Sequence, residues 1–422
     1  MSRFVIEGGR PLMGDVYVSG MKNSALPIIF ATVLVKGKTV LENVPQITDI
    51  TGALKILTDM GAEVEWLSPN TVSIVTDNLR PGTSDDGRVK TMRGSLYLLG
   101  AELGRVGKTH IGTPGGCGFD FRPIDRHVRC FEQLGARVEM GNDGVFALAD
   151  GGRLHGANIF FSAATVGGTV NCLLAAATAK GTTVVRNPAK EPHIVDLQNF
   201  LNRCGADIRG AGTNQITIHG VEDLHGCRYR ILPDMIEAGT FMVAAAATGG
   251  CVTVHDLVPK HMECIEPQLY EMGVHLDVHP NAITVSADGP LRPISFTTEP
   301  YPGFPTDMHP QMSVLCSLAE SGMSTATEGI FGARFQYTAE LRKMGVDIVL
   351  NLNQAKIFGR GELNGAVVES HDLRAGAAMV IAGLAAKGRT VVEDPHAYIA
   401  RGYLNFAGKL KSLGASIVEE WQ

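Results

Sequence analysis

The chain has 422 residues, of which 45% are hydrophobic and 19% charged, with 50 glycines and a formal net charge of −6. This length exceeds one ordinary hydrophobic core, so we expect two domains of an α/β protein with many tight turns. The net negative charge argues against general binding to nucleic acid or anionic membranes, because both depend on a basic surface.

Residues 1–20 lack the basic start and apolar core of a signal peptide, and no apolar run reaches the roughly 18 to 20 residues that span a bilayer. The eight cysteines are scattered without a C-x-x-C pair, so neither a zinc site nor a disulfide framework is indicated. We therefore expect a cytoplasmic protein with reduced thiols, without membrane insertion and without a metal or organic cofactor. The sequence gives no indication of a protein partner.

A short pattern, apolar-x-x-apolar-Gly-small-x-apolar, recurs six times at intervals of about 70 residues. Its glycines are Gly61, Gly135, Gly205, Gly273, Gly345 and Gly414. A second pattern keeps the same interval and reads as the end of a small apolar helix, a glycine and a β-branched strand. Its copies occupy residues 31–45, 100–112, 175–188, 244–256, 318–329 and 382–394. Each repeat is thus predicted to hold two helix-to-strand units, with the glycine in the left-handed conformation that closes a helix.

The helices that lead into the second pattern are rich in Ala, Gly, Leu and Val and almost uncharged, which is typical of helices buried on all sides. Strands must then lie outside them, so we expect an inside-out α/β barrel in which three repeats pack their helices within a wall of sheets, formed twice. The predicted domains are residues 22–232, and residues 1–21 together with 233–422. A doubly wound sheet is the alternative, but no G-x-G-x-x-G follows a strand.

Polar residues collect where these buried helices begin. The six starts lie in residues 19–27, 90–100, 164–174, 232–242, 304–315 and 370–380. Helix starts offer unpaired N–H groups and a partial positive charge, so converging starts could bind an anion. Lys22, Arg93 and Arg374 would add positive charge there. Asp307 and Asp372 could be simple helix caps that pair with the arginines, but their recurrence at equivalent repeat positions favours a functional interpretation.

Residues 113–127 depart from the repeat. Glycines on both sides of Cys117 predict an open loop that exposes the thiol, and a cation such as Arg122 nearby would raise the thiolate fraction. Most cysteines are buried and inert, but a Gly-Gly-Cys-Gly context is unusual for a structural cysteine. The sequence therefore predicts a reactive thiol at Cys117.

Together these segments resemble the UDP-N-acetylglucosamine 1-carboxyvinyltransferase family of enolpyruvyl transferases, over essentially the whole chain. The most specific segments are Ser19–Asn23, Gly115–Cys117 running into Arg122–Asp125, Phe304–Met308, Asp372–Arg374 and Arg401–Tyr403. The resemblance implies the inside-out α/β fold of two three-repeat globes. It also implies transfer of the enolpyruvyl group of phosphoenolpyruvate to the 3-hydroxyl of UDP-N-acetylglucosamine with release of phosphate, the first committed step of peptidoglycan synthesis.

The resemblance also implies roles for single residues. Lys22, Arg122 and Arg401 would hold the phosphate and carboxylate of phosphoenolpyruvate, since an arginine fork binds two oxygens at once. Asp307 would be the base for the 3-hydroxyl, and Cys117 the general acid toward the methylene carbon. The catalytic set implied in this way is Cys117, Asp307, Lys22, Arg401 and Asp372.

Substrate-binding residues are implied at the helix starts and in the Cys117 loop. Asn23 would contact the sugar, and Arg122, Pro123 and Asp125 would contact the uridine. The other implied substrate-binding residues are Lys22, Arg93, Thr165, Val166, Gly167, Thr306, Asp307, Arg334, Arg374 and Arg401. We expect the two domains to close over the anionic ligands and exclude water. Fosfomycin alkylates the loop cysteine in this family, so the presence of Cys117 predicts that the protein is susceptible to fosfomycin.

The chain departs from the family at several polar positions. Gly332 and Ala333 stand where the family has Glu-Asn, and Ala400 stands where it has Asp. Met235 replaces an arginine, and His193 replaces a glutamate. The loss of neighbours that orient acting residues can reduce the rate or change the acceptor.

Three alternatives therefore stay open. The sister reaction on shikimate 3-phosphate is disfavoured by the Gly-Gly-Cys loop and the Arg-Pro-Ile-Asp segment. A transferase with a different nucleotide acceptor is the second alternative. A paralogue that binds without catalysis is the third, and the presence of Cys117, Asp307 and Lys22 argues against it.

Overall fold

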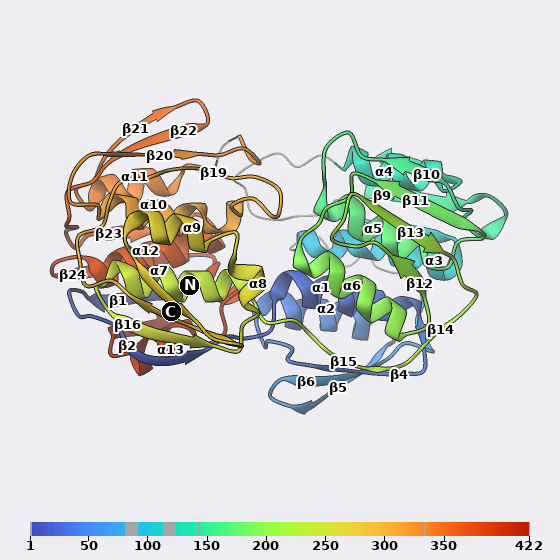
Figure 1. Ribbon diagram of the computed structural model, residues 1–422. Coiled ribbons are helices and arrows are strands. Elements are labelled where there is room, and N and C mark those ends of the chain that lie inside the picture. Colours follow the sequence, from blue (N-terminus) through green and yellow to red (C-terminus); the bar gives the residue numbers. More distant parts are fainter. Residues whose placement is uncertain (1, 81–91, 113–123, 142–143, 333, 422) are drawn as a thin grey trace. The chain divides into compact units, whose positions relative to one another are not determined.

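The computed structural model describes residues 2–80, 92–112, 124–141, 144–332 and 334–421. Within these ranges the chain forms two compact units (Figure 1). The first unit comprises residues 2–19 and 233–421, and the second unit comprises residues 20–112 and 124–232. None of the helices described is both long and apolar enough to cross a membrane.

Three four-stranded sheets are described in the first unit, and they share one arrangement. In each sheet an edge strand runs parallel to its neighbour, and the next two pairings are antiparallel. The strand orders are β2-β16-β18-β17, β19-β20-β22-β21 and β23-β24-β1-β25. The strands are β1 (Ser2–Glu7), β2 (Met13–Tyr17), β16 (Cys251–His255), β17 (His275–Val278), β18 (Ala282–Ser286), β19 (Ser295–Thr297), β20 (Met323–Thr327), β21 (Asp347–Asn351), β22 (Gln354–Phe358), β23 (Val367–Glu369), β24 (Arg389–Asp394) and β25 (Ser416–Trp421).

The second unit repeats this arrangement in the sheets β15-β4-β6-β5 and β10-β11-β13-β12. The described strands of its third sheet, β7-β9-β8, are antiparallel, and β14 and β3 form a short parallel pair. The strands are β3 (Val35–Lys36), β4 (Lys38–Glu42), β5 (Glu63–Ser68), β6 (Thr71–Val75), β7 (Lys108–Ile111), β8 (Ala136–Gly141), β9 (Gly144–Ala149), β10 (Asn158–Phe160), β11 (Thr182–Arg186), β12 (Asp207–Arg209), β13 (Gln215–His219), β14 (Leu224–His225) and β15 (Arg228–Arg230). Across the described ranges every sheet is open at both edges, so the fold is a mixed α/β fold of separate sheets.

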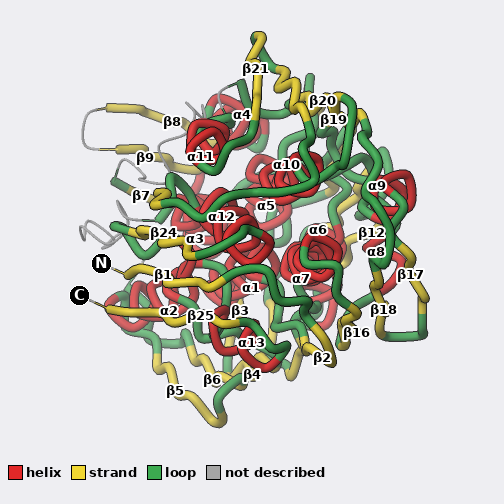
Figure 2. The backbone as a smooth tube through the Cα atoms, turned by 90° about the vertical axis from the view of Figure 1, so that its left-hand side faces the viewer, coloured by secondary structure: helices red, strands yellow, loops and turns green. Residues whose placement is uncertain are grey.

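Helices form the core of the first unit. The helices α7 (Met235–Ala247), α10 (His309–Ser317) and α12 (Leu373–Ala385) pack against one another and are buried along almost their whole length. In Figure 2, which faces this unit, they lie nearer the middle, while strands such as β1, β18 and β21 lie nearer the outside. This confirms the prediction that the uncharged helices are buried. The shorter helices are α8 (Pro259–Met262), α9 (Glu266–Met272), α11 (Tyr337–Lys343) and α13 (Phe406–Ser412).

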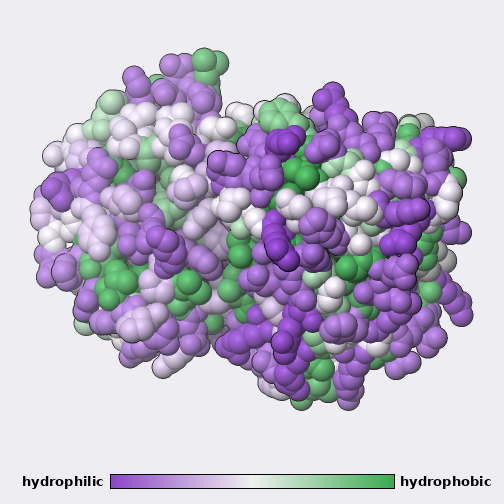
Figure 3. Space-filling view, turned by 45° about the vertical axis from the view of Figure 1, so that its right-hand side comes forward, coloured by the Kyte–Doolittle hydropathy of each residue, from purple (hydrophilic) through white to green (hydrophobic). Residues whose placement is uncertain are grey.

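The second unit has an equivalent set of helices. The helices α1 (Lys22–Ala31), α3 (Tyr97–Val106) and α5 (Val166–Ala176) are mostly buried, and α3 packs against both of the others. The remaining helices are α2 (Thr48–Asp59), α4 (Asp125–Gln133) and α6 (Pro192–Arg203). On the face shown in Figure 3, hydrophilic residues predominate and hydrophobic residues form separate small areas, as expected when apolar side chains fill the interior.

The repeated glycines end helices as predicted. All six glycines of the first pattern have φ between 88° and 104°, and each follows a helix and precedes a strand. In the second pattern the turn before the strand also contains a left-handed glycine in every copy. These glycines are Gly37, Gly107, Gly181, Gly249, Gly322 and Gly388. A positive φ is inexpensive only for glycine, so the sequence pattern fixes where each helix stops.

Candidate active site

The carboxylate of Asp307 is the centre of an ion-pair cluster in the first unit. Asp307 lies in the 3-10 helix η5 (Thr306–Met308), which leads into α10. Its Oδ1 accepts a hydrogen bond from Arg334 Nη1 at 3.0 Å, and its Oδ2 accepts bonds from Arg374 Nε and Nη2 at 3.2 and 3.1 Å. Both arginine side chains are at most 3% exposed, whereas 28% of the Asp307 side chain is exposed. The carboxylate is thus held in a fixed orientation and is reachable from outside.

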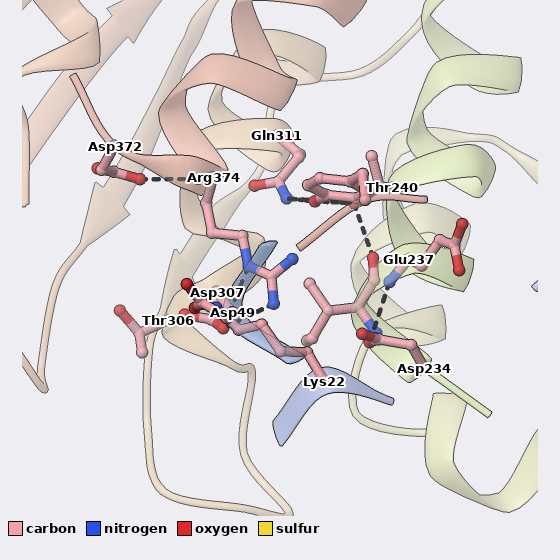
Figure 4. Close-up of polar contacts among 12 residues, drawn as sticks. Lys22, Asp49, Asp234, Glu237, Thr240, Thr306, Asp307, Gln311, Asp372 and Arg374 are labelled. Atoms are coloured by element: carbon pink, nitrogen blue, oxygen red, sulfur yellow. Dashed lines mark hydrogen bonds and ion pairs between the residues drawn. The ribbon is translucent and has the colours of Figure 1, made fainter. Parts of the chain in front are cut away.

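The guanidinium group of Arg374 packs against the ring of Tyr403. Its guanidinium carbon lies 5.3 Å from the centroid of the Tyr403 ring, a distance that suits a cation–π contact. The Tyr403 hydroxyl shares hydrogen bonds with Thr240 and Gln311 in the buried helix core. Burial alone would lower the pKa of Arg374, but Tyr403 and Asp307 outweigh it and raise the pKa. Figure 4 shows Arg374 between the start of α12 and Asp307.

Asp372 caps helix α12. Its Oδ1 accepts hydrogen bonds from the backbone N–H groups of Arg374 and Ala375 at 2.7 and 3.0 Å, and the residue is buried. The structure therefore gives Asp372 the cap role that was the alternative interpretation. Its implied catalytic role stays a prediction.

Glu328 is a buried carboxylate that the sequence analysis missed. It follows β20, and its Oε1 accepts bonds from the backbone N–H groups of Ile330 and Phe331 at 2.9 and 3.1 Å. Its Oε2 accepts a bond from the Thr306 hydroxyl at 2.8 Å, and that hydroxyl in turn accepts one from Arg334 Nη1 at 2.9 Å. Glu328 therefore fixes both the loop before Arg334 and the hydroxyl that Arg334 contacts. Its position at the end of the second repeat pattern was the one feature of the sequence that could have indicated its role.

Arg401 ends a second short helix, η6 (Ile399–Arg401), which packs against α12. The buried carboxylate of Asp394 accepts bonds from the backbone N–H groups of Tyr398 and Ile399 at 2.8 and 3.0 Å. Burial raises the pKa of Asp394, and these two bonds oppose that effect. Asp394, which the sequence analysis also missed, therefore positions the turn that carries Arg401.

In the second unit, three implied binding residues gather around the buried ring of His127. Burial lowers the pKa of His127 to about 4, with Arg93 adding to this effect and Asp125 opposing it. A Cβ at Gly167 would lie 2.8 Å from the His127 ring, so any other residue there would force the ring to shift. Asn171 holds the ring, because its Nδ2 lies 2.8 Å from His127 Nδ1. His127 itself was not singled out from the sequence.

The other implied residues of the second unit lie at helix starts. Lys22 begins α1, and its Nζ donates to Asp49 Oδ2 at 3.1 Å. Asp49 carried no signal in the repeat patterns. Thr165 caps α5 by accepting a bond from the Gly168 N–H at 3.3 Å. Val166 is the first residue of α5, and Asn23 lies partly exposed in the first turn of α1.

Several residues singled out from the sequence fall outside the described residues. They are Cys117, Arg122, Pro123 and Ala333. Of the other departures from the family, Met235 and His193 are buried, Ala400 is partly exposed within η6, and Gly332 is exposed. In the part of the chain that the structure describes, no group of three His, Cys, Asp or Glu side chains could hold a metal ion.

Comparison with known proteins places the chain among carboxyvinyltransferases. Residues 6–410 match the family model for EPSP synthase (3-phosphoshikimate 1-carboxyvinyltransferase). A UDP-N-acetylglucosamine 1-carboxyvinyltransferase of Clostridium botulinum is 46% identical over 99% of this chain and 100% of its own. The enzyme of that name numbered 3 in Caldanaerobacter subterraneus is 46% identical over 99% of both chains.

Solved structures agree in fold. The enolpyruvyl transferase NikO from Streptomyces tendae superposes with a TM-score of 0.89 at 26% identity, covering 99% of both chains. EPSP synthase from Acinetobacter baumannii has a TM-score of 0.76 at 22% identity over the full length of both, which shows a shared fold only. From the full-length relatives at 46% identity, the chain belongs to the UDP-N-acetylglucosamine 1-carboxyvinyltransferase family of enolpyruvyl transferases.

Proposed function

We propose that this protein transfers the enolpyruvyl group of phosphoenolpyruvate to the 3-hydroxyl of UDP-N-acetylglucosamine and releases phosphate. The observation that carries the proposal is the Asp307 carboxylate, fixed by Arg334 and Arg374 and still partly exposed, in a family whose named relatives have this activity. A carboxylate in that position suits a base that accepts the proton of an attacking hydroxyl.

The reaction is an addition followed by an elimination. The 3-hydroxyl oxygen bonds to C2 of phosphoenolpyruvate while Asp307 takes its proton and Cys117 delivers a proton to C3. The C2–O bond to phosphate then breaks, C3 loses a proton, and the enol ether remains. Cationic groups stabilise the negative charge of this sequence, a role that suits Lys22, Arg122 and Arg401.

Other residues are proposed to orient the acceptor or to support the catalytic groups. Asn23 would contact the sugar, and Arg122, Pro123 and Asp125 the uridine. The remaining proposed substrate-binding residues are Arg93, Thr165, Val166, Gly167, Thr306, Arg334 and Arg374. Asp372 is proposed as a further catalytic residue in addition to its role as a helix cap.

The finer architecture is part of the same proposal. We propose an inside-out α/β barrel with two three-repeat domains, residues 22–232 and residues 1–21 with 233–422. The identical strand arrangement of five sheets and the buried α7, α10 and α12 support it. We also place the reaction in the cytoplasm as an early step of peptidoglycan synthesis, which the free thiols of the described cysteines favour.

The experiment that tests the function is phosphate release by the purified protein. We expect release only when phosphoenolpyruvate and UDP-N-acetylglucosamine are both present, and none with shikimate 3-phosphate or UMP as acceptor. Phosphate release from phosphoenolpyruvate with shikimate 3-phosphate as acceptor, but not with UDP-N-acetylglucosamine, would overturn the acceptor assignment. A folded protein that releases no phosphate with any of these acceptors would contradict the proposed activity.

A further inference from the structure

Two cysteines of the second unit lie side by side at the end of α6. Cys204 follows the last residue of α6, and its sulfur is 3.4 Å from the sulfur of Cys227. A disulfide needs a separation of about 2.05 Å, so the two sulfurs would have to approach each other by about 1.35 Å. The pair is 23 residues apart in sequence, and no C-x-x-C spacing marks it.

Backbone hydrogen bonds fix the positions of both cysteines. The N–H of His225, two residues before Cys227, donates to the Cys204 carbonyl at 2.8 Å. The Cys227 carbonyl accepts a bond from the Val40 N–H at 2.8 Å, which ties it to β4. Backbone hydrogen bonds therefore hold both the segment around Cys204 and the segment around Cys227, and together they set the short distance between the two sulfurs.

The two thiols have unequal environments. Cys227 is partly exposed, whereas Cys204 is fully buried. The hydrogen bond from Cys204 lowers the pKa of the Cys227 thiol, and Arg203 adds to this effect while burial opposes it. The same hydrogen bond, together with burial, raises the pKa of Cys204. An accessible thiol with a lowered pKa beside a buried thiol with a raised pKa is the arrangement of an attacking and a resolving cysteine.

We propose that Cys227 and Cys204 form a reversible redox pair, in which Cys227 reacts with a hydroperoxide and Cys204 resolves the product into a disulfide. The Cys227 thiolate attacks the terminal oxygen of the hydroperoxide and the O–O bond breaks, which gives a sulfenic acid. The leaving alkoxide or hydroxide takes a proton from solvent and departs as an alcohol or water. The Cys204 sulfur then attacks the Cys227 sulfur. Water leaves with the sulfenic oxygen and the Cys204 proton, and a dithiol reductant reverses the bond.

The disulfide would fasten α6 to the strand that follows Cys227. Asp196 on α6 already accepts bonds from the Tyr229 hydroxyl at 2.5 Å and from the Leu232 N–H at 3.2 Å. Oxidation would add a covalent tie at the other end of the same contact between α6 and β15. The proposal concerns a modification site and does not depend on the proposed transferase activity.

The rest of the chain supplies a matched comparison. Cys130 and Cys172 also lie within hydrogen-bond reach of each other, and this bond together with burial raises the pKa of Cys130. Both are fully buried, so an oxidant in solution cannot reach them. Cys251 is partly exposed and serves as a single-thiol reference.

The test is a peptide map of the full-length protein after stepwise addition of hydrogen peroxide, denaturation and alkylation. Trypsin cleaves at Arg209, so Cys204 and Cys227 fall in separate peptides, residues 204–209 and 210–228. We expect these two peptides to become linked, with the loss of two hydrogen atoms, roughly tenfold faster than residues 130–137 become linked to the Cys172 peptide. A dithiol reductant should release them.

Two variants separate the roles of the pair. In Cys204→Ser the disulfide should be absent and Cys227 should accumulate as a sulfenic acid that dimedone traps. In Cys227→Ser neither the link nor a dimedone adduct at Cys204 should form. If Cys204 and Cys227 stay fully alkylated in the unmodified chain while Cys251 oxidises, the proposal is wrong. Linkage of Cys130 to Cys172 at the same rate would equally contradict it.

Discussion

Glu328 and Asp394 occupy equivalent positions in two repeats, six residues after the turn glycines Gly322 and Gly388. Both are buried, and both accept backbone N–H groups of the turn that leads to an arginine. Glu328 directly follows β20, and Asp394 is the last residue of β24. The repeat thus carries a positioning carboxylate behind Arg334 and another behind Arg401. Substitutions at these carboxylates should act on catalysis through the arginines.

Replacing Glu328 by glutamine should lower kcat about 10- to 100-fold, because an amide cannot accept all the donors that converge on the carboxylate and Thr306 would lose its fixed orientation. Phosphate release measured over a range of phosphoenolpyruvate concentrations separates kcat from KM. Glu102→Gln is the matched control, since Glu102 is a buried carboxylate that accepts the Thr109 hydroxyl at 2.5 Å. Equal turnover of the two variants would contradict the positioning role.

Arg374→Lys should lower kcat about 100-fold, because lysine cannot place two donors on one Asp307 oxygen and the carboxylate would shift. Arg342→Lys provides the comparison, since Arg342 also directs Nε and Nη2 to one oxygen, the carbonyl of Ile348. Turnover in Arg342→Lys should match that of the parent protein. If Arg374→Lys retained full kcat, orientation of Asp307 by the fork would be ruled out.

Gly167→Ala should destabilise the protein by about 1–3 kcal/mol, since the added Cβ would lie 2.8 Å from the His127 ring. The same change should raise KM for UDP-N-acetylglucosamine. Thermal unfolding and kinetics with varied acceptor test both effects. A second change, His127→Ala, should recover part of the lost stability by making room. Gly52→Ala in α2, where no atom beyond the helix's own backbone and the chain neighbours lies within 4 Å of the added Cβ, should leave stability equal or higher.

The buried ring of His309 predicts acid sensitivity. Burial lowers the pKa of His309 to about 3, and the charge of Arg334 adds to this effect. The unfolded chain binds a proton near pH 6.5 and the folded chain does not, so stability falls as the pH drops from about 6.5 toward 3, by up to about 1.4 kcal/mol per pH unit.

In His309→Phe the unfolded chain can no longer bind a proton at this position. The variant keeps an aromatic ring against Phe296, Phe335 and Tyr337. Its free energy of unfolding should therefore fall less between pH 7 and pH 5 than that of the parent. Denaturant unfolding at the two pH values measures the difference. The exposed His219 supplies the control, because His219→Gln should follow the parent curve. A parallel fall in all three proteins would exclude His309 as the source.

Regular features of the molecule were predictable because they repeat. Glycines such as Gly61 and Gly273 mark helix ends by a conformation that other residues avoid, and the almost uncharged stretch that forms α12 indicated burial by its composition. Asp307 was identified because polar residues, including Asp372, recur at the equivalent helix starts of the repeats. These signals are local, so one sequence is enough to read them.

Two of the residues that were missed, His127 and Glu328, make contacts over long sequence separations. His127 contacts Asn171, 44 residues away in sequence, and Glu328 contacts Thr306, 22 residues away. Glu328 receives four donors, the hydroxyls of Thr298 and Thr306 and two backbone N–H groups, but nothing in the local sequence distinguishes it from a solvated glutamate. Asp372 illustrates the converse, since a cap and a catalytic acid have the same local sequence at a helix start.

The N-terminal strand β1 lies between β24 and β25, so Ser2 pairs with both Asp394 and Trp421. The described residues of the second unit, in contrast, all come before residue 233 in the sequence. During synthesis the second unit can therefore fold as soon as residue 232 has left the ribosome, whereas the first 19 residues must wait for the last strand. Protease protection of ribosome-bound chains of increasing length would reveal this order. A stop codon that removes only β25 would therefore leave the opening residues of the protein without a partner on one side.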